Sequence, residues 1–331
     1  MKKEMPSVRE LKNEDIPNVI ELLNMVFSEQ GYFETPIDNS WWKWRYELSP
    51  FGEPIHLVAE NSSGKIVGFR SFWPWELIYE GMTLKAYQPQ ATVVHPSFRR
   101  IGIFREMNLA ALNKAKEEGA DILFNFPNQA SLPGNISMGW HFVSKIPWLV
   151  KPLRPLAIAR SCFSRDKARP LELGKDYELK EKHCLKLTGT EASGGFIRTK
   201  VSPEFFKWRY LDHPFFHYGF HSFSSGSKWM TGIFSVVQKV CRKEMYLVDL
   251  SGHPECLSSF FRELKAIATK MGVSFIATIL TSGYRMEDLW KQGFFKYHRK
   301  NMVALALNEG LLGKAYDLKY WKLVGGMHDT L

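Results

Sequence analysis

Hydrophobic residues near the amino terminus recur three and four positions apart, which is the spacing of one face of an α-helix. These residues are Ile16, Val19, Ile20, Leu23 and Val26. Asn13 comes just before them, and we expect its side chain to cap the helix by accepting a hydrogen bond from a free backbone amide. The run before it, from Ser7, predicts a short strand, so the chain opens as strand, turn and helix.

Paired apolar runs farther along the chain predict two β-hairpins. In the first half they flank the polar turn at residues 61–65, and in the second half they flank residues 224–227. After each hairpin come a third strand, a helix and another apolar strand. Gly119 and Gly272 follow the two helices and are predicted to end them, because glycine readily adopts the left-handed conformation found just past a helix.

The two halves also share short similar sequences. KWRY occurs in WWKWRYELSP, residues 41–50, and in FFKWRYLDHP, residues 205–214, and both segments have a helical pattern. Asp38 and Ser202 occupy matching N-cap positions. Further similarities follow in the same order: His95-Pro96 with His253-Pro254, Phe104-Arg105-Glu106 with Phe261-Arg262-Glu263, Gly119 with Gly272, and residues 138–142 with residues 292–296. This repeated order predicts an internal duplication.

The length of the chain fits two globular domains. A chain of 331 residues exceeds the size of one ordinary core. Residues 151–174 are rich in proline and basic residues and lack a sustained period, so we expect a linker there. It would separate a first domain at residues 1–150 from a second at residues 175–331. Each domain is predicted to be an α/β (α+β) unit with a mixed sheet and flanking helices.

Charge and cysteine content restrict the partners. The net charge of +10 favours an anionic partner but does not distinguish nucleic acid, anionic lipid and a phosphorylated small molecule. Cys162, Cys184, Cys241 and Cys256 are irregularly spaced, which indicates neither a zinc site nor a disulfide framework. The first residues lack a signal-peptide pattern, and no apolar run approaches the roughly 18 residues of a membrane helix. We therefore expect a cytoplasmic protein without a membrane partner or a bound metal.

A basic loop that contains glycine follows the third strand of the first half. It reads SFRRIGIF, and the next helix is predicted to begin near Ile103 or Phe104. The free amides and the dipole of a helix N-terminus attract an anion. Gly102 would let the backbone approach a phosphate closely, and the two arginines would add positive charge. The second half reads HPECLSSFF at this place, without glycine or basic residues, and we expect it not to bind phosphates.

This loop resembles the cofactor loop of the GNAT acyltransferase superfamily, whose pattern is (Gln or Arg)-x-x-Gly-x-(Gly or Ala). Arg99 and Gly102 match the first and fourth positions, while Phe104 replaces the small residue at the sixth. Many family members carry an asparagine after the next strand and, about eleven residues later, a glycine followed by an aromatic residue. Asn128 and Gly139-Trp140 match that spacing here.

The resemblance covers about residues 7–150 and, more weakly, residues 196–308. It implies two GNAT-like units, the second without its phosphate loop. It also implies acetyl-CoA as co-substrate, with the pantetheine arm paired to the strand, the pyrophosphate on the loop amides, and the thiol end beside residues that follow the next strand. The implied cofactor-binding residues are Val93, Val94, Arg99, Arg100, Ile101, Gly102, Ile103, Phe104, Asn128 and Ser131.

The positions expected to carry the chemistry depart from the family pattern. Many members have a tyrosine acid seven residues after the asparagine; here Asn135 stands there, which can donate a hydrogen bond but cannot supply a proton. Some members have a glutamate base on the strand before the loop, where Gln90 could position a water. Glu34, in the loop GYFETP, is a candidate base. Glu76 and the terminal carboxylate of Leu331 are further candidates.

We expect an acyl-CoA-dependent N-acyltransferase that moves an acetyl group to an amine of a small molecule or peptide by direct attack. Nucleic acid is not among its expected partners, and the oligomeric state is left open. Two alternatives remain. One is a non-catalytic acyl-CoA-binding or scaffold protein, which the missing tyrosine and glutamate favour. The other is an aminoacyl-tRNA-dependent transferase, because tandem GNAT folds also occur in the peptidyltransferases that build cell-wall bridges.

Overall fold

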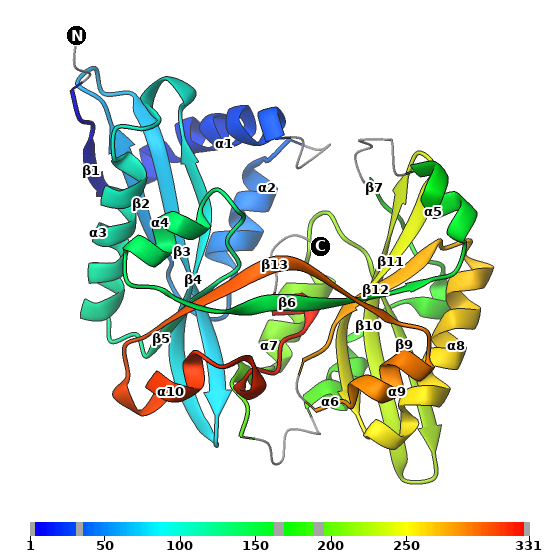
Figure 1. Cartoon of the computed structure of the whole chain (residues 1–331). Helices are drawn as coiled ribbons and strands as arrows, with labels where there is room; N and C mark the ends of the chain where they lie inside the picture. Colours follow the sequence, from blue (N-terminus) through cyan, green and yellow to red (C-terminus); the bar gives the residue numbers. More distant parts are fainter. Residues whose placement is uncertain (1–3, 31–35, 162–168, 189–194, 282, 328–331) are drawn as a thin grey trace. The chain divides into compact units, whose positions relative to one another are not determined.

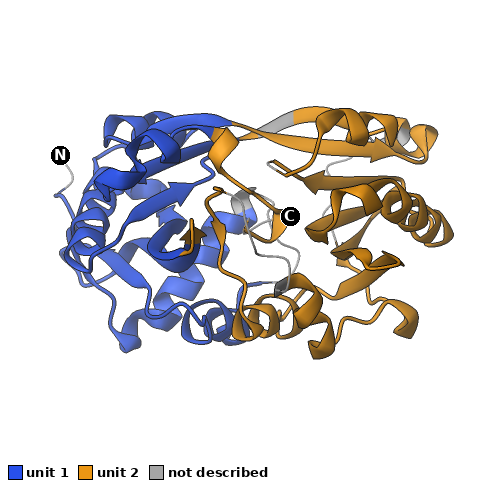
Figure 2. Cartoon of the chain, turned by 90° about the horizontal axis from the view of Figure 1, so that it is seen from below, with its two compact units in different colours: residues 1–77, 82–144, 301–317 blue, residues 78–81, 145–300, 318–331 orange. Residues whose placement is uncertain are grey.

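The computed structural model describes residues 4–30, 36–161, 169–188, 195–281 and 283–327. The chain forms two compact units, each assembled from separate segments of the sequence (Figure 2). The first unit contains residues 1–77, 82–144 and 301–317, and the second contains residues 78–81, 145–300 and 318–331.

The sheet of the first unit has the strand order β1-β2-β3-β4-β5-β13 (Figure 1). Its strands are β1 (Ser7–Glu10), β2 (Ile55–Glu60), β3 (Ile66–Tyr79), β4 (Met82–Val94), β5 (Ile122–Asn125) and the end of β13 (Phe295–Ala306). β2 pairs antiparallel with β1 and β3, and β5 pairs parallel with β4 and antiparallel with β13. The sheet is therefore mixed, as predicted, and the parallel pair needs a crossover helix.

Helices cover both faces of this sheet. They are α1 (Ile16–Gln30), α2 (Asn39–Trp42), α3 (Ile103–Glu117), α4 (Leu132–Ser137) and α10 (Leu312–Ala315). Tyr46, just after α2, packs on His56 of β2 with 4.5 Å between the ring centroids. Ala111 of α3 belongs to one buried cluster with Leu57 of β2. Because neighbouring strand residues face opposite sides of a sheet, α2 and α3 lie on opposite faces.

The predicted cap of α1 is wrong. Asn13 lies inside a 3-10 turn, Asn13–Asp15, that runs directly into α1 at Ile16. The carboxylate of Asp15 instead accepts hydrogen bonds from the backbone amide of Lys12 at 2.8 Å and from the Arg9 guanidinium at 2.7 Å. The Arg9 hydrogen bond lowers the pKa of Asp15. A charged acceptor fixed by two donors thus determines where the chain enters the helix.

The second unit repeats this architecture. Its sheet has the order β6-β12-β11-β10, and β9 and β7 both pair with β10. Its strands are β6 (His141–Pro152), β7 (Arg169–Pro170), β9 (Tyr218–Ser225), β10 (Lys228–Lys239), β11 (Arg242–Gly252) and β12 (Phe275–Ile279). The two-residue strand β8 (Arg198–Thr199) pairs with β3 instead. Its helices are α5 (Pro155–Ser161), α6 (Cys184–Thr188), α7 (Pro203–Phe206), α8 (Leu257–Lys270) and α9 (Met286–Lys291). β11 and β12 are parallel, with α8 as the crossover between them.

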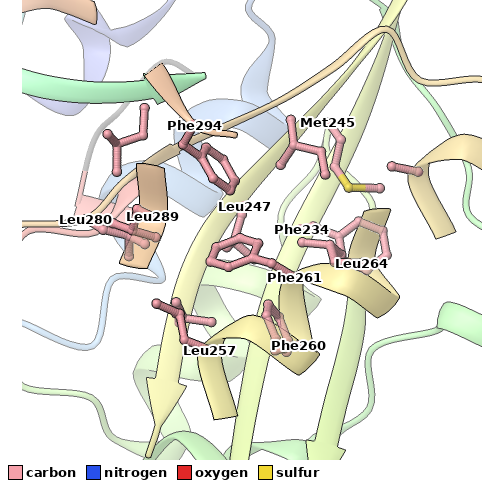
Figure 3. Close-up of a cluster of buried hydrophobic side chains, with 14 of the residues drawn as sticks. Phe234, Met245, Leu247, Leu257, Phe260, Phe261, Leu264, Leu280, Leu289 and Phe294 are labelled. Carbon is pink, nitrogen blue, oxygen red and sulfur yellow. The ribbon is translucent and has the colours of Figure 1, made fainter. Parts of the chain in front are cut away.

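The core of the second unit lies between α8 and its sheet. Figure 3 shows Phe260, Phe261 and Leu264 of α8 in one buried cluster with Phe234 of β10 and Leu247 of β11. Apolar residues three and four apart on α8 supply this face, as expected for an amphipathic helix. The burial of these side chains fixes α8 on the sheet and therefore fixes the loop that precedes it.

Two long strands, β6 and β13, each begin in one unit and end in the other. β6 starts in the first unit and pairs with β12 in the second, at Trp148 with Ile279 and onward to Pro152 with Phe275. β13 starts in the second unit and pairs with β5 in the first, from Val303 with Asn125 to Ala306 with Ile122. Each sheet is thus completed by a strand from the other half of the sequence. α5 and β7 lie in the predicted linker, and the domain limits at residues 150 and 174 stay predictions.

Both copies of KWRY have the same local structure. In each, a short α-helix continues as a π-helical turn, at Lys43–Glu47 after α2 and at Lys207–Leu211 after α7. The predicted caps are confirmed: Asp38 accepts a hydrogen bond from the Trp41 amide at 2.9 Å, and Ser202 accepts one from the Phe205 amide at 3.1 Å. The aromatic residues of both copies are buried, which confirms that they pack in the core.

The predicted hairpins and helix ends are also confirmed. β2 and β3 flank residues 61–65, and β9 and β10 flank a turn at Gly226. Gly119 and Gly272 follow α3 and α8 with φ of +75° and +74°, the left-handed conformation that glycine adopts without strain. The repeated order of elements supports the proposed duplication, which stays a prediction.

Candidate active site

Strands β4 and β5 separate toward one end of the first sheet. They pair at Ala86 with Ile122 and at Tyr87 with Leu123, after which β4 continues to Val94 whereas β5 ends at Asn125. Ala91, within β4, has a φ of +45°, which is rare for a residue with a side chain and marks a break in the regular strand. Val93 and Val94 therefore lie at the end of β4, past the last residue that pairs with β5.

The loop after β4 is tied down at its start. The backbone amide of His95 donates to the carbonyl of Val67 at 2.8 Å, and its Nδ1 accepts from the Ser97 amide at 3.2 Å. A 3-10 turn, Pro96–Phe98, follows, and the Arg99 Nε donates to the Val94 carbonyl at 3.1 Å. One of the donor groups of Arg99 is therefore bonded to the end of β4. The sequence did not indicate this hydrogen bond.

Two left-handed residues then turn the chain into α3. Arg100 has a φ of +68°, and Gly102, the N-cap of α3, has a φ of +98°. Such a turn exposes successive backbone amides on its inner side, and the first amides of α3 have no partner inside the helix. A Cβ added at Gly102 would meet only the Cε of Met5, at 3.3 Å, so the space over the backbone is otherwise open. This arrangement can hold a phosphate or pyrophosphate.

Asn128 and Ser131 lie together before α4. The Oδ1 of Asn128 accepts from the backbone amide of Ser131 at 2.9 Å and from its hydroxyl at 3.0 Å. The Leu132 amide donates to the Asn128 carbonyl at 3.1 Å. The structure thus brings these two predicted residues into contact. Their side chains are hydrogen-bonded to each other in the turn that precedes α4.

Asn135 is held inside the protein. Its side chain is 1% exposed, and its Nδ2 donates to the Ser131 carbonyl at 2.9 Å. Its own carbonyl accepts from the amides of Met138 and Trp140. The side-chain amide that could donate to a leaving group is thus already hydrogen-bonded to Ser131. In this structure Asn135 stabilises the α4 turn.

The structure describes two of the remaining catalytic candidates. Gln90 is half-buried on β4, one residue before the break at Ala91, and Glu76 is half-buried on β3. Glu34 and the terminal carboxylate of Leu331 lie outside the described residues. The catalytic assignments of Asn135, Gln90 and Glu34 therefore stay predictions.

The corresponding loop of the second unit has a different structure. The 3-10 turn Pro254–Cys256 leads straight into α8 at Leu257, and Glu255 is paired with Lys228 at 2.7 Å. Cys256 is buried. Gly252 sits so close to β10 that an added Cβ would lie 2.3 Å from the Trp229 carbonyl oxygen. This loop carries an acidic side chain and has no left-handed residue after Gly252 before α8 begins.

The carboxy-terminal segment also occupies the end of the second sheet. The hydroxyl of Thr281, just past β12, donates to the Trp321 carbonyl and accepts from the Leu323 amide. Arg209 donates to the Gly326 carbonyl at 2.9 Å, and Gly326 lies against the carbonyl of Val248 in β11. Residues 321–326 therefore lie between the diverging ends of β11 and β12. The equivalent place in the first unit is beside β4 and β5.

The described residues contain neither a membrane-spanning helix nor a metal-binding cluster. None of the helices in the described ranges is long and apolar enough to cross a membrane. Within the same ranges, no group of three or more His, Cys, Asp or Glu side chains is placed to hold a metal ion.

Comparison with known proteins defines the class of fold. The protein is similar to a GCN5-related N-acetyltransferase from Anabaena variabilis, with a TM-score of 0.62 and 13% identity over 91% of this chain and 73% of that one. A GCN5-related N-acetyltransferase from Kribbella flavida gives a TM-score of 0.54 at 9% identity, over 92% and 72% of the two chains. Saccharomyces cerevisiae N-myristoyltransferase with bound myristoyl-CoA gives 0.58 at 11% identity, over 92% and 84%. The fold is that of these acyltransferases.

One family model matches the sequence of the first unit. Residues 7–143 match the model described as an acetyltransferase (GNAT) domain. No curated protein sequence matches the chain. The match contains the β4–α3 loop, so the suspected resemblance is confirmed for the segment that carries the glycine and the two arginines.

Proposed function

We propose that the chain is an acyl-CoA-dependent N-acyltransferase whose first unit binds acetyl-CoA and transfers the acetyl group to an amine of a small molecule or peptide. The observation that carries this proposal is the loop between β4 and α3. Its left-handed Arg100 and Gly102 direct backbone amides toward one place at the start of the 15-residue helix α3. A pyrophosphate is the group that this geometry fits best.

In the proposed reaction, the amine nitrogen attacks the thioester carbon. The new C–N bond forms as the C–S bond breaks, the electron pair leaves with sulfur, and the amine proton passes to a base or to water. The chain contributes binding and orientation: the loop amides hold the pyrophosphate, and the separated end of β4 offers Val93 and Val94 to the pantetheine arm. Placing both reactants in one site supplies much of the rate enhancement expected of such an enzyme.

The second unit is proposed to bind no acyl-CoA. Its loop presents Glu255 where the first unit presents arginines, and residues 321–326 lie against the end of its sheet. A cytoplasmic location and an origin by duplication belong to the same proposal. The repeated caps and π-helical turns of the two KWRY segments support the duplication.

A non-catalytic acyl-CoA-binding protein is the second candidate function. The burial of Asn135 favours it, since that side chain stands where many relatives place an acid and is 1% exposed here. Both candidates require the same cofactor loop, so only turnover distinguishes them.

The experiment that tests the proposal measures release of the CoA thiol from acetyl-CoA in the presence of a broad panel of amines. We expect steady release with at least one amine and no release above background without any. Binding of acetyl-CoA without turnover on the whole panel would favour the non-catalytic protein. Salt-sensitive binding of tRNA with no affinity for CoA would favour the aminoacyl-tRNA-dependent alternative instead.

A further inference from the structure

One buried cation of the first unit has a polar atom without a hydrogen-bond partner. Arg70, on β3, is 3% exposed, its Nε makes no hydrogen bond with any residue that the structure describes, and no ion pair joins it to a carboxylate among them. It lies over the ring of Phe72, 5.1 Å from the ring centre. Asp15 is the single buried carboxylate in the described part of the first unit, and it is already paired with Arg9.

Such a residue is costly to keep in a protein interior. Burial disfavours the charged form unless a counter-ion or hydrogen bonds compensate it. Desolvation lowers the pKa of Arg70 to about 9, so the guanidinium still carries its charge at neutral pH. A charge without a protein partner therefore indicates that a ligand supplies the missing anion.

Arg70 lies between the sheet and α3. It pairs across the sheet with Leu57, which clusters with Ala111 of α3. Gly68, two residues earlier on the same face, lies directly under the first turns of α3, because an added Cβ would be 3.2 Å from side-chain atoms of Ile103 and Met107. The guanidinium is thus placed beneath the helix whose N-terminus forms the proposed phosphate site.

Arg70 is also level with the break in β4. β3 and β4 are joined by a two-residue turn at Glu80 and Gly81, whose φ values of +48° and +81° are those of a tight hairpin. Counting residues outward from this turn brings Arg70 next to Ala91, where β4 leaves the regular conformation. The phosphate loop lies beyond Val94, so Arg70 lies about three residues back along β4 from that loop, toward the expected acyl end of the proposed site.

Two buried acceptors on the helices α3 and α4 are likewise unused. Asn108 of α3 and Asn135 of α4 are 3% and 1% exposed, and the Oδ1 of each has no hydrogen-bond partner among the described residues. Both flank Phe104: the Nδ2 of Asn108 donates to its carbonyl at 2.6 Å, and a Cβ added at Gly134 would be 2.9 Å from its ring. Arg70, Asn108 and Asn135 are therefore three buried side chains of the first unit that each keep a polar atom available for a ligand.

We propose that Arg70 binds a carboxylate of the substrate at the acyl end of the site, an inference that rests on the proposed function. A guanidinium and a carboxylate pair through two parallel hydrogen bonds, and each neutralises the other in a dry site. The carboxylate has two chemical sources. It ends an acyl group derived from a dicarboxylic acid, or it belongs to an acceptor of the α-amino acid type.

The first arm of the test measures binding. Affinities for acetyl-CoA and succinyl-CoA are determined by calorimetry for the parent and for Arg70→Met, which keeps an apolar side chain of similar length. If the acyl group carries the carboxylate, the parent prefers succinyl-CoA by about tenfold or more, the discrimination expected of one charged hydrogen-bonded pair. Arg70→Met is expected to lose this preference while still binding acetyl-CoA.

The second arm measures turnover of acetyl-CoA with α-amino acids, each compared with the amine that remains after its decarboxylation. If the acceptor carries the carboxylate, kcat/KM favours the amino acid by about tenfold or more in the parent and not in Arg70→Met. Equal preferences of parent and variant in both arms would overturn the inference. A fall in kcat alone, with every substrate, would also overturn it and would place Arg70 at the leaving thiolate.

Stability without ligand provides an independent control. Arg70→Met is expected to have the same melting temperature as the parent or a higher one, because it removes an unpaired buried charge. Arg209→Met removes a buried arginine whose Nε donates to the Gly326 carbonyl at 2.9 Å, and its melting temperature should fall. Marked destabilisation by Arg70→Met would show that the guanidinium has a protein partner. Failure of the parent to bind any CoA would sink the proposed function and the inference together.

Discussion

Gly102→Glu is expected to abolish the stabilisation of the protein by acetyl-CoA. The backbone of Gly102 has a φ of +98°, and the space above it is open except for Met5. A glutamate there would strain the backbone, project into the proposed pyrophosphate site and repel the anion. In the parent, acetyl-CoA at 100 times its dissociation constant should add about 2.7 kcal/mol to the free energy of unfolding.

The measurement is the change in melting temperature as acetyl-CoA is added, since that shift separates ligand binding from the strain of the substitution itself. Ser259→Glu is the matched control, because Ser259 precedes Phe261 by two residues as Gly102 precedes Phe104, and it lies in the first turn of α8 in the second unit. We expect a rising melting temperature in the parent and the control and a flat one in Gly102→Glu. Equal shifts in all three proteins would exclude this loop as the binding site.

Trp321→Ala is expected to destabilise the protein strongly without affecting acetyl-CoA binding. Trp321 is fully buried, and its carbonyl accepts a hydrogen bond from Thr281. Loss of a buried indole costs about 3–5 kcal/mol, because the remaining cavity collapses only in part. The segment that it anchors lies against the end of the second sheet, so the first unit should keep its ligand.

Urea unfolding followed by circular dichroism measures this loss. Trp290→Ala is the control, since Trp290 is 55% exposed on α9 and its removal should change the free energy of unfolding by about 0.5 kcal/mol or less. Equal effects of the two substitutions would contradict the anchoring role of Trp321. Acetyl-CoA should raise the melting temperature of both variants as it does that of the parent.

Much of the local structure could be predicted from the sequence. Asp38 and Ser202 were identifiable as caps because short polar side chains precede apolar residues at helical spacing. The start of α3 at Ile103 followed from the strand, basic loop and glycine before it. Asn13 was misassigned because the pattern does not show that Asp15, two residues later, is fixed by Arg9.

Features that depend on distant partners could not be predicted. β6 has the composition of an ordinary strand, and nothing in it indicates that its second part pairs with β12, more than 120 residues later in the sequence. The π-helical turns in both KWRY segments arise where aromatic residues pack on the sheet, a tertiary effect. The place of residues 321–326 depends on hydrogen bonds to Thr281 and Arg209, which are far away in the sequence.

The candidate site was predictable to a similar extent. The loop from Arg99 to Phe104 carries a sequence pattern because its backbone needs a glycine at one position. Arg70 has no such sequence pattern. In the run GFRSFW it is one polar residue of a predicted strand, and only the assembled structure shows that it is buried with an unpaired Nε. Catalytic groups supplied by separate loops, such as Glu34, have no spacing rule that would identify them.

The stoichiometry of acetyl-CoA binding tests most directly the claim that the first unit alone holds the cofactor. Isothermal titration calorimetry of the full chain with acetyl-CoA gives this number without any knowledge of the acceptor. A single site per chain is predicted, lost in Gly102→Glu and kept in Ser259→Glu. Two sites per chain, or a single site that survives Gly102→Glu, would contradict it.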